Sequence, residues 1–245
     1  MNEPTPPQQP DGAPDEVHDG VPDGVPDGVP DGVPDGVPEF ETRDPGAREF
    51  WDERFERGFT PWDQAGVQPA FESFAQAHPA AAVLIPGCGN AWEARWLAER
   101  GRTVRAIDFA PLAVANARVA LGDFADVVEE ADFFTYEPPF AADWIFERAF
   151  LCALPKALRP HYAQRMAALL APGALLAGFF FLGDTPKGPP FGIARTELDA
   201  LLTPYFTLLD DQPVEGSLPV FVGRERWLTW QRNDTPAAPP PSSRT

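Results

Sequence analysis

The stretch Val83-Leu84-Ile85-Pro86-Gly87-Cys88-Gly89-Asn90 determines the fold expected for this chain of 245 residues. Its first four residues are apolar and have the length of a buried strand, and a helical pattern follows over residues 91–100. A glycine turn between a strand and a helix is where a doubly wound α/β sheet binds a nucleotide-like ligand. Gly87 is expected to allow the tight turn. Gly89 has no Cβ, so a ligand can approach the backbone there, next to the free N–H groups of the helix N-terminus.

Strand-like and helix-like segments alternate on both sides of this turn. We expect helices over residues 47–57, 69–77, 91–100, 112–121, 160–170 and 195–202. We expect strands over residues 83–86, 103–107, 125–128, 143–146, 174–182, 206–209 and 220–231. This alternation predicts βαβ units and one doubly wound α/β domain with a mostly parallel sheet. Gly223 divides the last strand-like segment into halves, which predicts an antiparallel hairpin added to that sheet.

The two ends of the chain differ in composition from its middle. Residues 19–38 are five tandem copies of Asp-Gly-Val-Pro, in which proline removes a backbone donor and glycine raises the entropy cost of order. Because valine alone buries too little surface to offset that cost, we expect residues 1–44 to be a disordered acidic tail. We interpret the repeat as a spacer, with a docking motif as the alternative. Residues 234–245, rich in Pro and Ser, are expected to be a second disordered tail, which leaves 45–233 as the folded domain.

The charge and the cysteine content argue against several classes of partner. The net charge is −18, and an acidic surface repels phosphate backbones and anionic lipids, so we expect neither nucleic acid nor a membrane as partner. The chain has no run of about 18 apolar residues that would span a membrane, and its N-terminus lacks the basic and apolar regions of a signal peptide. Two cysteines do not suggest a disulfide framework. We expect a cytoplasmic protein and a monomer.

A carboxylate at the end of the second expected strand supports a nucleoside site. Asp108 follows Gly89 by 19 residues, and a carboxylate at this place can accept hydrogen bonds from both ribose hydroxyls of an adenosine. After the third strand, Asp132 could accept from the adenine amino group and Phe133 could cover the ring. Trp92 stands where a dinucleotide site has its third glycine, so the adenosine of S-adenosylmethionine fits better than NAD.

Each of these residues also has a purely structural interpretation. The two glycines could form a simple turn, Asp108 could cap the helix that begins near Pro111, and Phe133 could be a core residue. None of the three histidines has a visible Ser, Cys or acidic partner for a catalytic triad, so we do not expect hydrolase chemistry. No cluster of His, Cys or Asp has metal-ligand spacing, so we expect no metal.

Four segments resemble the signatures of one protein family. Residues 49–64 resemble the opening signature of the thiopurine S-methyltransferase family, especially its halide and thiol methyltransferase branch. Residues 84–89 are similar to the glycine turn of that family, 145–153 to the segment after its fourth strand, and 188–192 to its proline-rich lid. The similarity runs from about residue 48 to residue 232, and it is specific because all four segments occur in order.

The resemblance implies a seven-stranded methyltransferase fold with S-adenosylmethionine as the methyl donor. It also implies that the stretch from Trp51 to Trp62 folds over the donor, whose sulfonium is attracted by indole faces that also exclude water. Without the resemblance, Trp51 and Phe55 at helical spacing would be interpreted as core residues. The residues and the resemblance together give the expected cofactor-binding set: Trp51, Phe55, Trp62, Gly87, Gly89, Asp108, Asp132, Phe133 and Arg148.

The implied reaction is methyl transfer to a small soft nucleophile, such as a thiol, hydrosulfide, thiopurine or halide. The lone pair of this acceptor attacks the methyl group in line, so the protein mainly positions the reactants and excludes water. Arg148, the expected catalytic residue, could favour a thiolate, or it could simply pair with Glu147 or another acid. The alternatives are a methyltransferase that acts on a chalcogen oxyanion, amine or carboxylate, and a protein that binds S-adenosylmethionine without turnover.

The two cysteines follow strands that are expected to be neighbours in the sheet. Cys88 follows the first strand and Cys152 the fourth, so both thiols could lie near the floor of the pocket. Alternatively, both are small buried apolar residues.

Overall fold

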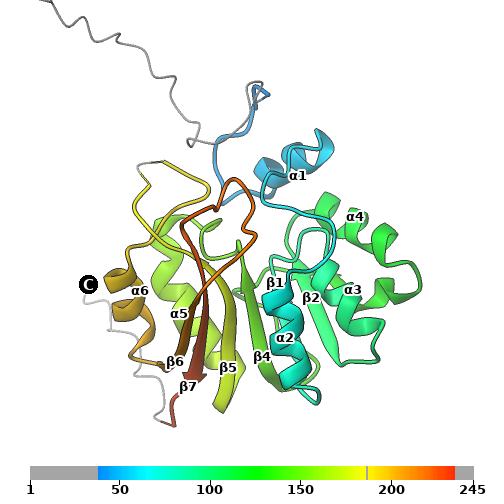
Figure 1. The fold of residues 1–245 in the computed structure, drawn as a ribbon. Helices are drawn as coiled ribbons and strands as arrows, with labels where there is room; N and C mark the ends of the chain where they lie inside the picture. The colour runs from blue at the N-terminus through cyan, green and yellow to red at the C-terminus, as the bar shows by residue number, and fades with distance from the viewer. Residues whose placement is uncertain (1–37, 186, 235–245) are drawn as a thin grey trace, which may run out of the picture.

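Seven strands form one sheet in the order β3-β2-β1-β4-β5-β7-β6 in the computed structural model, which describes residues 38–185 and 187–234 (Figure 1). The strands are β1 (Val83–Pro86), β2 (Val104–Asp108), β3 (Val128–Glu130), β4 (Ala142–Arg148), β5 (Leu170–Phe181), β6 (Phe206–Pro213) and β7 (Glu225–Arg232). The pairs among β1 to β5 are parallel, whereas β7 runs antiparallel to β5 and β6. The sheet is therefore mostly parallel, as the sequence predicts. Its strand order reverses between β1 and β4, which is where such sheets bind ligands.

Helices cover both faces of this sheet, which confirms the doubly wound architecture. The helices are α1 (Arg48–Glu56), α2 (Pro69–Ala77), α3 (Trp92–Ala98), α4 (Pro111–Leu121), α5 (Arg159–Leu169) and α6 (Arg195–Leu202). Helices α2, α3 and α4 contribute to one buried core, and α5 and α6 contribute to a second one. Successive residues of a strand point to opposite faces, so Trp144 and Phe146 of β4 lie in the first core and Ile145 in the second.

Proline and glycine set several helix boundaries. Pro69 and Pro111 occupy the first positions of α2 and α4, where a missing N–H costs nothing because that donor has no partner within the helix. Gly101 after α3 and Gly122 after α4 adopt positive φ angles of 67° and 57°, which a residue with a Cβ adopts only at an energetic cost.

Two predicted strands differ from the structure. Residues 125–128 were expected to be a strand, but Gly122–Val127 form a 3-10 helix and β3 begins at Val128. Pairing with β2, a tertiary contact, determines where β3 starts. The predicted hairpin around Gly223 is wrong as well: only Glu225–Arg232 form a strand, and its antiparallel partners are β5 and β6. Gly223 has a φ of 73° and lies in the turn that precedes β7.

The segment before α1 is held against that helix. The backbone N–H groups of Glu41 and Thr42 donate to the Glu53 carboxylate at 2.9 and 3.0 Å, and the Thr42 hydroxyl also donates to it. The Thr42 hydroxyl and these N–H groups lower the pKa of Glu53 to about 2. Figure 1 shows this segment and α1 above one end of the sheet. Residues 38–44 belong to the stretch that the sequence assigns to the tail; the Asp-Gly-Val-Pro copies before Pro38 and the chain beyond residue 234 lie outside the described residues.

None of the helices within residues 38–185 and 187–234 combines the length and the apolar character needed to cross a membrane. The same part of the chain contains no group of three or more His, Cys, Asp or Glu side chains placed to hold a metal ion.

Candidate active site

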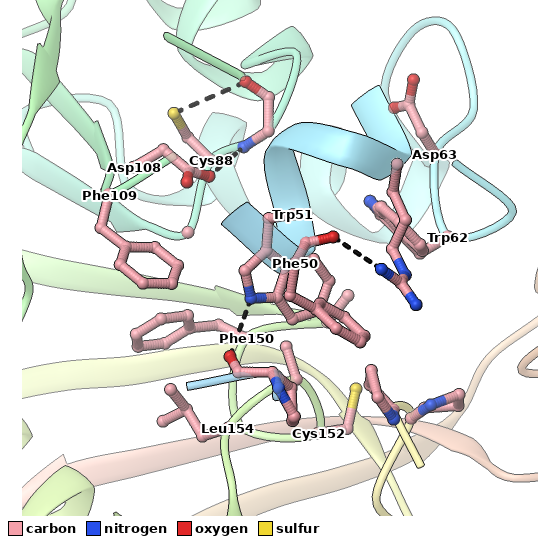
Figure 2. A pocket seen from close by; sticks show the side chains of 18 of the residues that line it. Phe50, Trp51, Trp62, Asp63, Cys88, Asp108, Phe109, Phe150, Cys152 and Leu154 are labelled. Carbon is pink, nitrogen blue, oxygen red and sulfur yellow. Dashed lines mark hydrogen bonds between the residues drawn. The ribbon is translucent and has the colours of Figure 1, made fainter. Parts of the chain in front are cut away.

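A cavity of about 1170 Å³ lies at the carboxyl ends of β1, β2 and β4. The segment before α1, α1 itself and the proline-rich loop 187–191 form its other walls. Aromatic side chains are the most common kind in its lining: Phe40, Phe50, Trp51, Phe55, Phe59, Trp62, Trp92, Phe109, Phe133, Phe134, Phe146, Phe150, Phe191 and Phe221. Figure 2 shows part of this lining, with Asp108 and Cys88 near one end and Trp62 and Cys152 nearer the other.

The glycine turn needs both of its glycines, for different reasons. Gly87 and Gly89 have φ angles of 60° and 51°, a region that disfavours residues with a Cβ. A Cβ on Gly87 would lie 2.4 Å from the Phe150 ring, so the absence of a side chain there lets Phe150 pack against the turn. A Cβ on Gly89 would meet only Phe55, at 3.7 Å, so this glycine leaves the turn open on the cavity side.

Two backbone N–H groups, one of them from the glycine turn, hold the Asp108 carboxylate in place. Its two carboxylate oxygens accept from the N–H groups of Gly89 and Ala110, each at 3.0 Å. Burial raises the pKa of Asp108, an effect that these backbone hydrogen bonds oppose. Ala110, not Asp108, is the N-cap residue of α4, so the alternative interpretation of Asp108 as the helix cap does not hold. Because each carboxylate oxygen has a second lone pair, Asp108 can still accept two hydroxyl groups from the cavity side.

The residues after β3 contribute both to the core and to the cavity wall. Asp132 is exposed and lines the cavity, and its carboxylate accepts from the N–H of Phe134 at 2.9 Å. Phe133 is buried in the core and packs edge-on against Phe150 at 5.0 Å between ring centroids, yet it also lines the cavity. Phe109, which the sequence analysis missed, lines the same wall (Figure 2). Its position directly after Asp108 was the available signal.

Three aromatic side chains from α1 and the loop after it form the opposite wall. The ring of Trp62 lies 5.5 Å from Trp51 and 6.1 Å from Phe55, with nearly perpendicular planes in both pairs. The Trp51 indole N–H donates to the carbonyl of Pro45 at 2.9 Å. All three side chains pack with Ala110 and neighbouring residues of α4 and also line the cavity, so the core and pocket interpretations both hold.

Asp63 joins this aromatic wall to the glycine turn. Its carboxylate accepts from the Asn90 amide at 2.6 Å and from the Trp92 indole N–H at 2.9 Å. Trp92 therefore has a partner at the first position of α3, where a dinucleotide site has its third glycine. The sequence analysis missed Asp63 and Asn90 as site residues, although Asp63 lies in the signature segment 49–64.

Arg148 lies at the end of β4 and lines the cavity. Its Nη1 donates to Glu93 of α3 at 2.8 Å, and the two side chains are only 11% and 9% exposed. Its Nη2 is buried without a hydrogen-bond partner among the described residues. Of the two roles considered for Arg148, the structure has the ion pair, with Glu93 rather than Glu147.

Glu147 turns away from Arg148 and organises the loop after β4. Its carboxylate accepts from the N–H groups of Phe150 and Leu151 at 3.0 and 2.9 Å, and from the Tyr162 hydroxyl at 2.6 Å. Burial raises the pKa of Glu147 to about 7. Because Phe150 lines the cavity, Glu147 shapes the site from behind it.

Cys88 and Cys152 are both free and both line the cavity, which is one of the two interpretations that the sequence leaves open (Figure 2). Cys152 is also buried, as the other interpretation has it. Burial raises the pKa of each thiol. Both therefore stay protonated near neutral pH, which makes them poor nucleophiles.

A family model described as "Thiopurine S-methyltransferase" matches residues 46–233. The chain belongs to the thiopurine S-methyltransferase family. Similar proteins include "Probable thiol methyltransferase 2" of Arabidopsis thaliana, 29% identical over 76% of this chain and 85% of the relative. "Thiocyanate methyltransferase 1" of the same plant is 28% identical over 74% and 84%. "Thiopurine S-methyltransferase" of Bordetella petrii is 30% identical over 74% and 93%.

Solved structures share the fold. The 1,6-didemethyltoxoflavin-N1-methyltransferase of Burkholderia thailandensis, with bound S-adenosylhomocysteine, has a TM-score of 0.61 at 21% identity, covering 76% of this chain and 87% of its own. Magnesium protoporphyrin IX methyltransferase of Synechocystis PCC 6803, also with bound S-adenosylhomocysteine, has a TM-score of 0.60 at 14% identity, covering 76% and 97%.

Membership in the thiopurine S-methyltransferase family accounts for segments that are distant in sequence but adjacent in space. Residues from each of the four signature segments, 49–64, 84–89, 145–153 and 188–192, line the same cavity. The family signatures thus mark one site rather than four separate features of the fold.

Proposed function

We propose that this protein is an S-adenosylmethionine-dependent methyltransferase that transfers a methyl group to the sulfur of a small-molecule thiol. The observation that carries this proposal is the position of Asp108, at the tip of β2 beside the glycine turn, in a cavity that Trp51 and Trp62 also line. By their names, the relatives act on thiols, thiocyanate and thiopurines. Such acceptors are nucleophiles, so the methyl donor must supply an electrophilic methyl group.

The donor fits the residues of the cavity. Asp108 has one lone pair on each oxygen for the two ribose hydroxyls, and Gly89 leaves room for the nucleoside beside the backbone. Phe109 and Phe133 would cover the adenine, and Asp132 would accept from its amino group. Trp51, Phe55 and Trp62 would close over the sulfonium, which is attracted to aromatic faces.

The chain contributes positioning rather than acid–base chemistry. S-adenosylmethionine supplies the electrophilic methyl group when bound. The aromatic walls exclude water from the reacting atoms, which strengthens electrostatic interactions inside the cavity. The positive charge of Arg148, which lines the cavity, would favour the thiolate form of the acceptor. Glu147 and the two cysteines are not candidates for a general base, because Glu147 faces away from the cavity and both thiols are protonated.

The domain limits, the cytoplasmic location and the monomeric state stay predictions. We propose residues 45–233 as the methyltransferase domain, a range close to the matched residues 46–233. A small-molecule acceptor is in keeping with an aromatic cavity of about 1170 Å³.

The test combines binding with an acceptor screen. We expect calorimetry to detect S-adenosylhomocysteine binding, and Asp108→Ala to weaken it by roughly 10- to 100-fold through lost charge-assisted hydrogen bonds. Asp123→Ala, an exposed carboxylate outside the cavity lining, is the control. Transfer of radiolabelled methyl groups to thiols, thiocyanate, halides, amines and chalcogen oxyanions then identifies the acceptor. Undiminished binding by Asp108→Ala would refute the donor site, and turnover restricted to non-sulfur acceptors would refute the thiol.

A further inference from the structure

The wall of the cavity formed by α1 and the segment before it carries two cations without a carboxylate partner. Arg43, in the segment before α1, and Arg54, in α1, both line the cavity. Neither forms an ion pair with a described carboxylate. Arg48 and Arg57 of the same region are both paired, to Glu130 and to Glu53. In a chain with a net charge of −18, unpaired guanidinium groups at a cavity point to an anionic ligand.

Arg54 is held in a fixed orientation by neutral groups. Its Cζ lies 3.3 Å from the ring centroid of Phe50 and 4.1 Å from that of Phe40. Its Nη1 donates to the backbone carbonyl of Phe50 at 2.7 Å. Nε and Nη2 form no hydrogen bond with described residues, so one N–H edge of the guanidinium stays available. Such an edge matches the two oxygens of a carboxylate.

Two cations, Arg43 and Arg54, and one anion, Glu39, are the charged side chains of this wall that line the cavity. Burial is the main cause that lowers the pKa of Arg54 to about 10; Glu53 opposes it and the neighbouring charge of Arg43 adds to it. The Glu53 oxygens are already occupied by Thr42, by the N–H of residue 41 and by Arg57. Glu39 is the carboxylate that lines the cavity on the same wall.

We propose that Arg43 and Arg54 form a carboxylate-binding site in the cavity. This inference rests on the proposed function, because that function brings a carboxylate to the cavity from either of two sources. One source is the carboxylate in the methionine part of the donor. The other is a carboxylate on the acceptor, which would then be a mercapto-carboxylic acid. Both present the same group to the free edge of Arg54.

Four compounds distinguish the two sources. S-adenosylhomocysteine has the methionine carboxylate, whereas 5′-methylthioadenosine lacks the amino acid part, and calorimetry gives the affinity of each. Among acceptors, 4-mercaptobenzoate has a carboxylate and 4-mercaptobenzamide has a neutral amide in its place, and methyl-transfer assays give their KM values. The variants are Arg54→Gln and Arg43→Gln. Arg48→Gln is the matched control, an exposed arginine of α1 that pairs with Glu130 and does not line the cavity.

We expect Arg54→Gln to weaken carboxylate binding by roughly 10- to 100-fold, the effect of losing a charge-assisted hydrogen bond. A weaker affinity for S-adenosylhomocysteine with unchanged 5′-methylthioadenosine identifies the donor carboxylate. A raised KM for 4-mercaptobenzoate alone identifies the acceptor carboxylate. Arg43→Gln is expected to act in the same direction, less strongly and with more salt dependence, because Arg43 is exposed.

Arg43 is exposed and forms no hydrogen bond or ion pair with described residues, so its variant tests the site even if Arg54→Gln fails to fold. Glu39→Gln should strengthen carboxylate binding. Equal effects of Arg43→Gln, Arg54→Gln and Arg48→Gln on all four compounds would overturn this inference alone. Absence of donor binding and of thiol turnover in the unaltered protein would overturn the proposed function, and this inference with it.

Discussion

The buried pair of Arg148 and Glu93 has both a structural and a chemical role in the proposed mechanism. The pair joins the end of β4 to the first turn of α3, two elements that border the cavity. Removing one partner of a buried pair leaves the other charge uncompensated, which costs roughly 3–5 kcal/mol. We expect Arg148→Met to lower the free energy of unfolding by about this amount, measured by urea denaturation.

The double variant Arg148→Met with Glu93→Gln separates the two roles. It removes the orphaned charge, so most of the lost stability should return. Methyl transfer should not return, because no guanidinium faces the acceptor sulfur. If both stability and turnover recover, Arg148 has a structural role and no role in methyl transfer.

Because Gly87 has no Cβ, the Phe150 ring can pack against the turn between β1 and α3. Gly87→Ala would place a methyl group 2.4 Å from the Phe150 ring at a φ of +60°. Gly101→Ala has a similar φ of +67° but meets nothing within 4 Å, so it is the matched control for the backbone cost alone. We expect Gly87→Ala to lose roughly 1–3 kcal/mol more stability than Gly101→Ala, the cost of overpacking. Equal losses in urea titrations would show that Phe150 yields without cost.

The loop after β4 is held by the carboxyl group of Glu147, whose pKa is raised. Burial raises the pKa of Glu147 from 4.5 to about 7, so the folded state holds the proton more tightly than the unfolded state. Its contribution to stability is therefore complete below pH 4.5 and is lost as the pH rises through about 7. The loss amounts to roughly 3 kcal/mol at most.

Glu147→Gln removes this titration and keeps an oxygen acceptor for the N–H groups of Phe150 and Leu151. We expect the stability of the unaltered protein, relative to this variant, to fall between about pH 4.5 and pH 7. Chemical denaturation at several pH values measures the difference. A difference that is constant or rises with pH would contradict the raised pKa.

At the scale of the whole molecule, the segment 38–45 forms part of the cavity wall, which leads to a prediction about truncation. A chain that starts at residue 38 keeps the contacts of Glu41 and Thr42 with Glu53 and the clamp of Phe40 on Arg54. We expect its thermal midpoint and its affinity for S-adenosylhomocysteine to equal those of the full chain. A chain that starts at residue 46 loses these contacts and part of the cavity wall, so both quantities should fall. If both truncated chains behave alike, the segment 38–45 has no part in the site.

Local features of the fold could be predicted from the sequence because their signals act over a few residues. The predicted bounds of β1, 83–86, and of α2, 69–77, are those of the structure. In both segments the apolar pattern and the positions of proline or glycine indicate the same boundaries. The parallel sheet followed from the alternation of elements, and the family followed from four ordered segments. The start of β3 was missed because it depends on pairing with β2 rather than on its own residues.

The sequence by itself determined the βαβ order, the glycine turn and the candidate acid at the tip of β2, since each follows from residues close together in the chain. Only the tertiary structure decided which side chains from distant parts of the sequence contact one another. Arg148 pairs with Glu93 rather than its neighbour Glu147, and Asp63 binds Trp92. Neighbouring strand residues point to opposite faces, so Glu147 and Arg148 have different surroundings, and packing brings distant residues to each. No local pattern contains those distances.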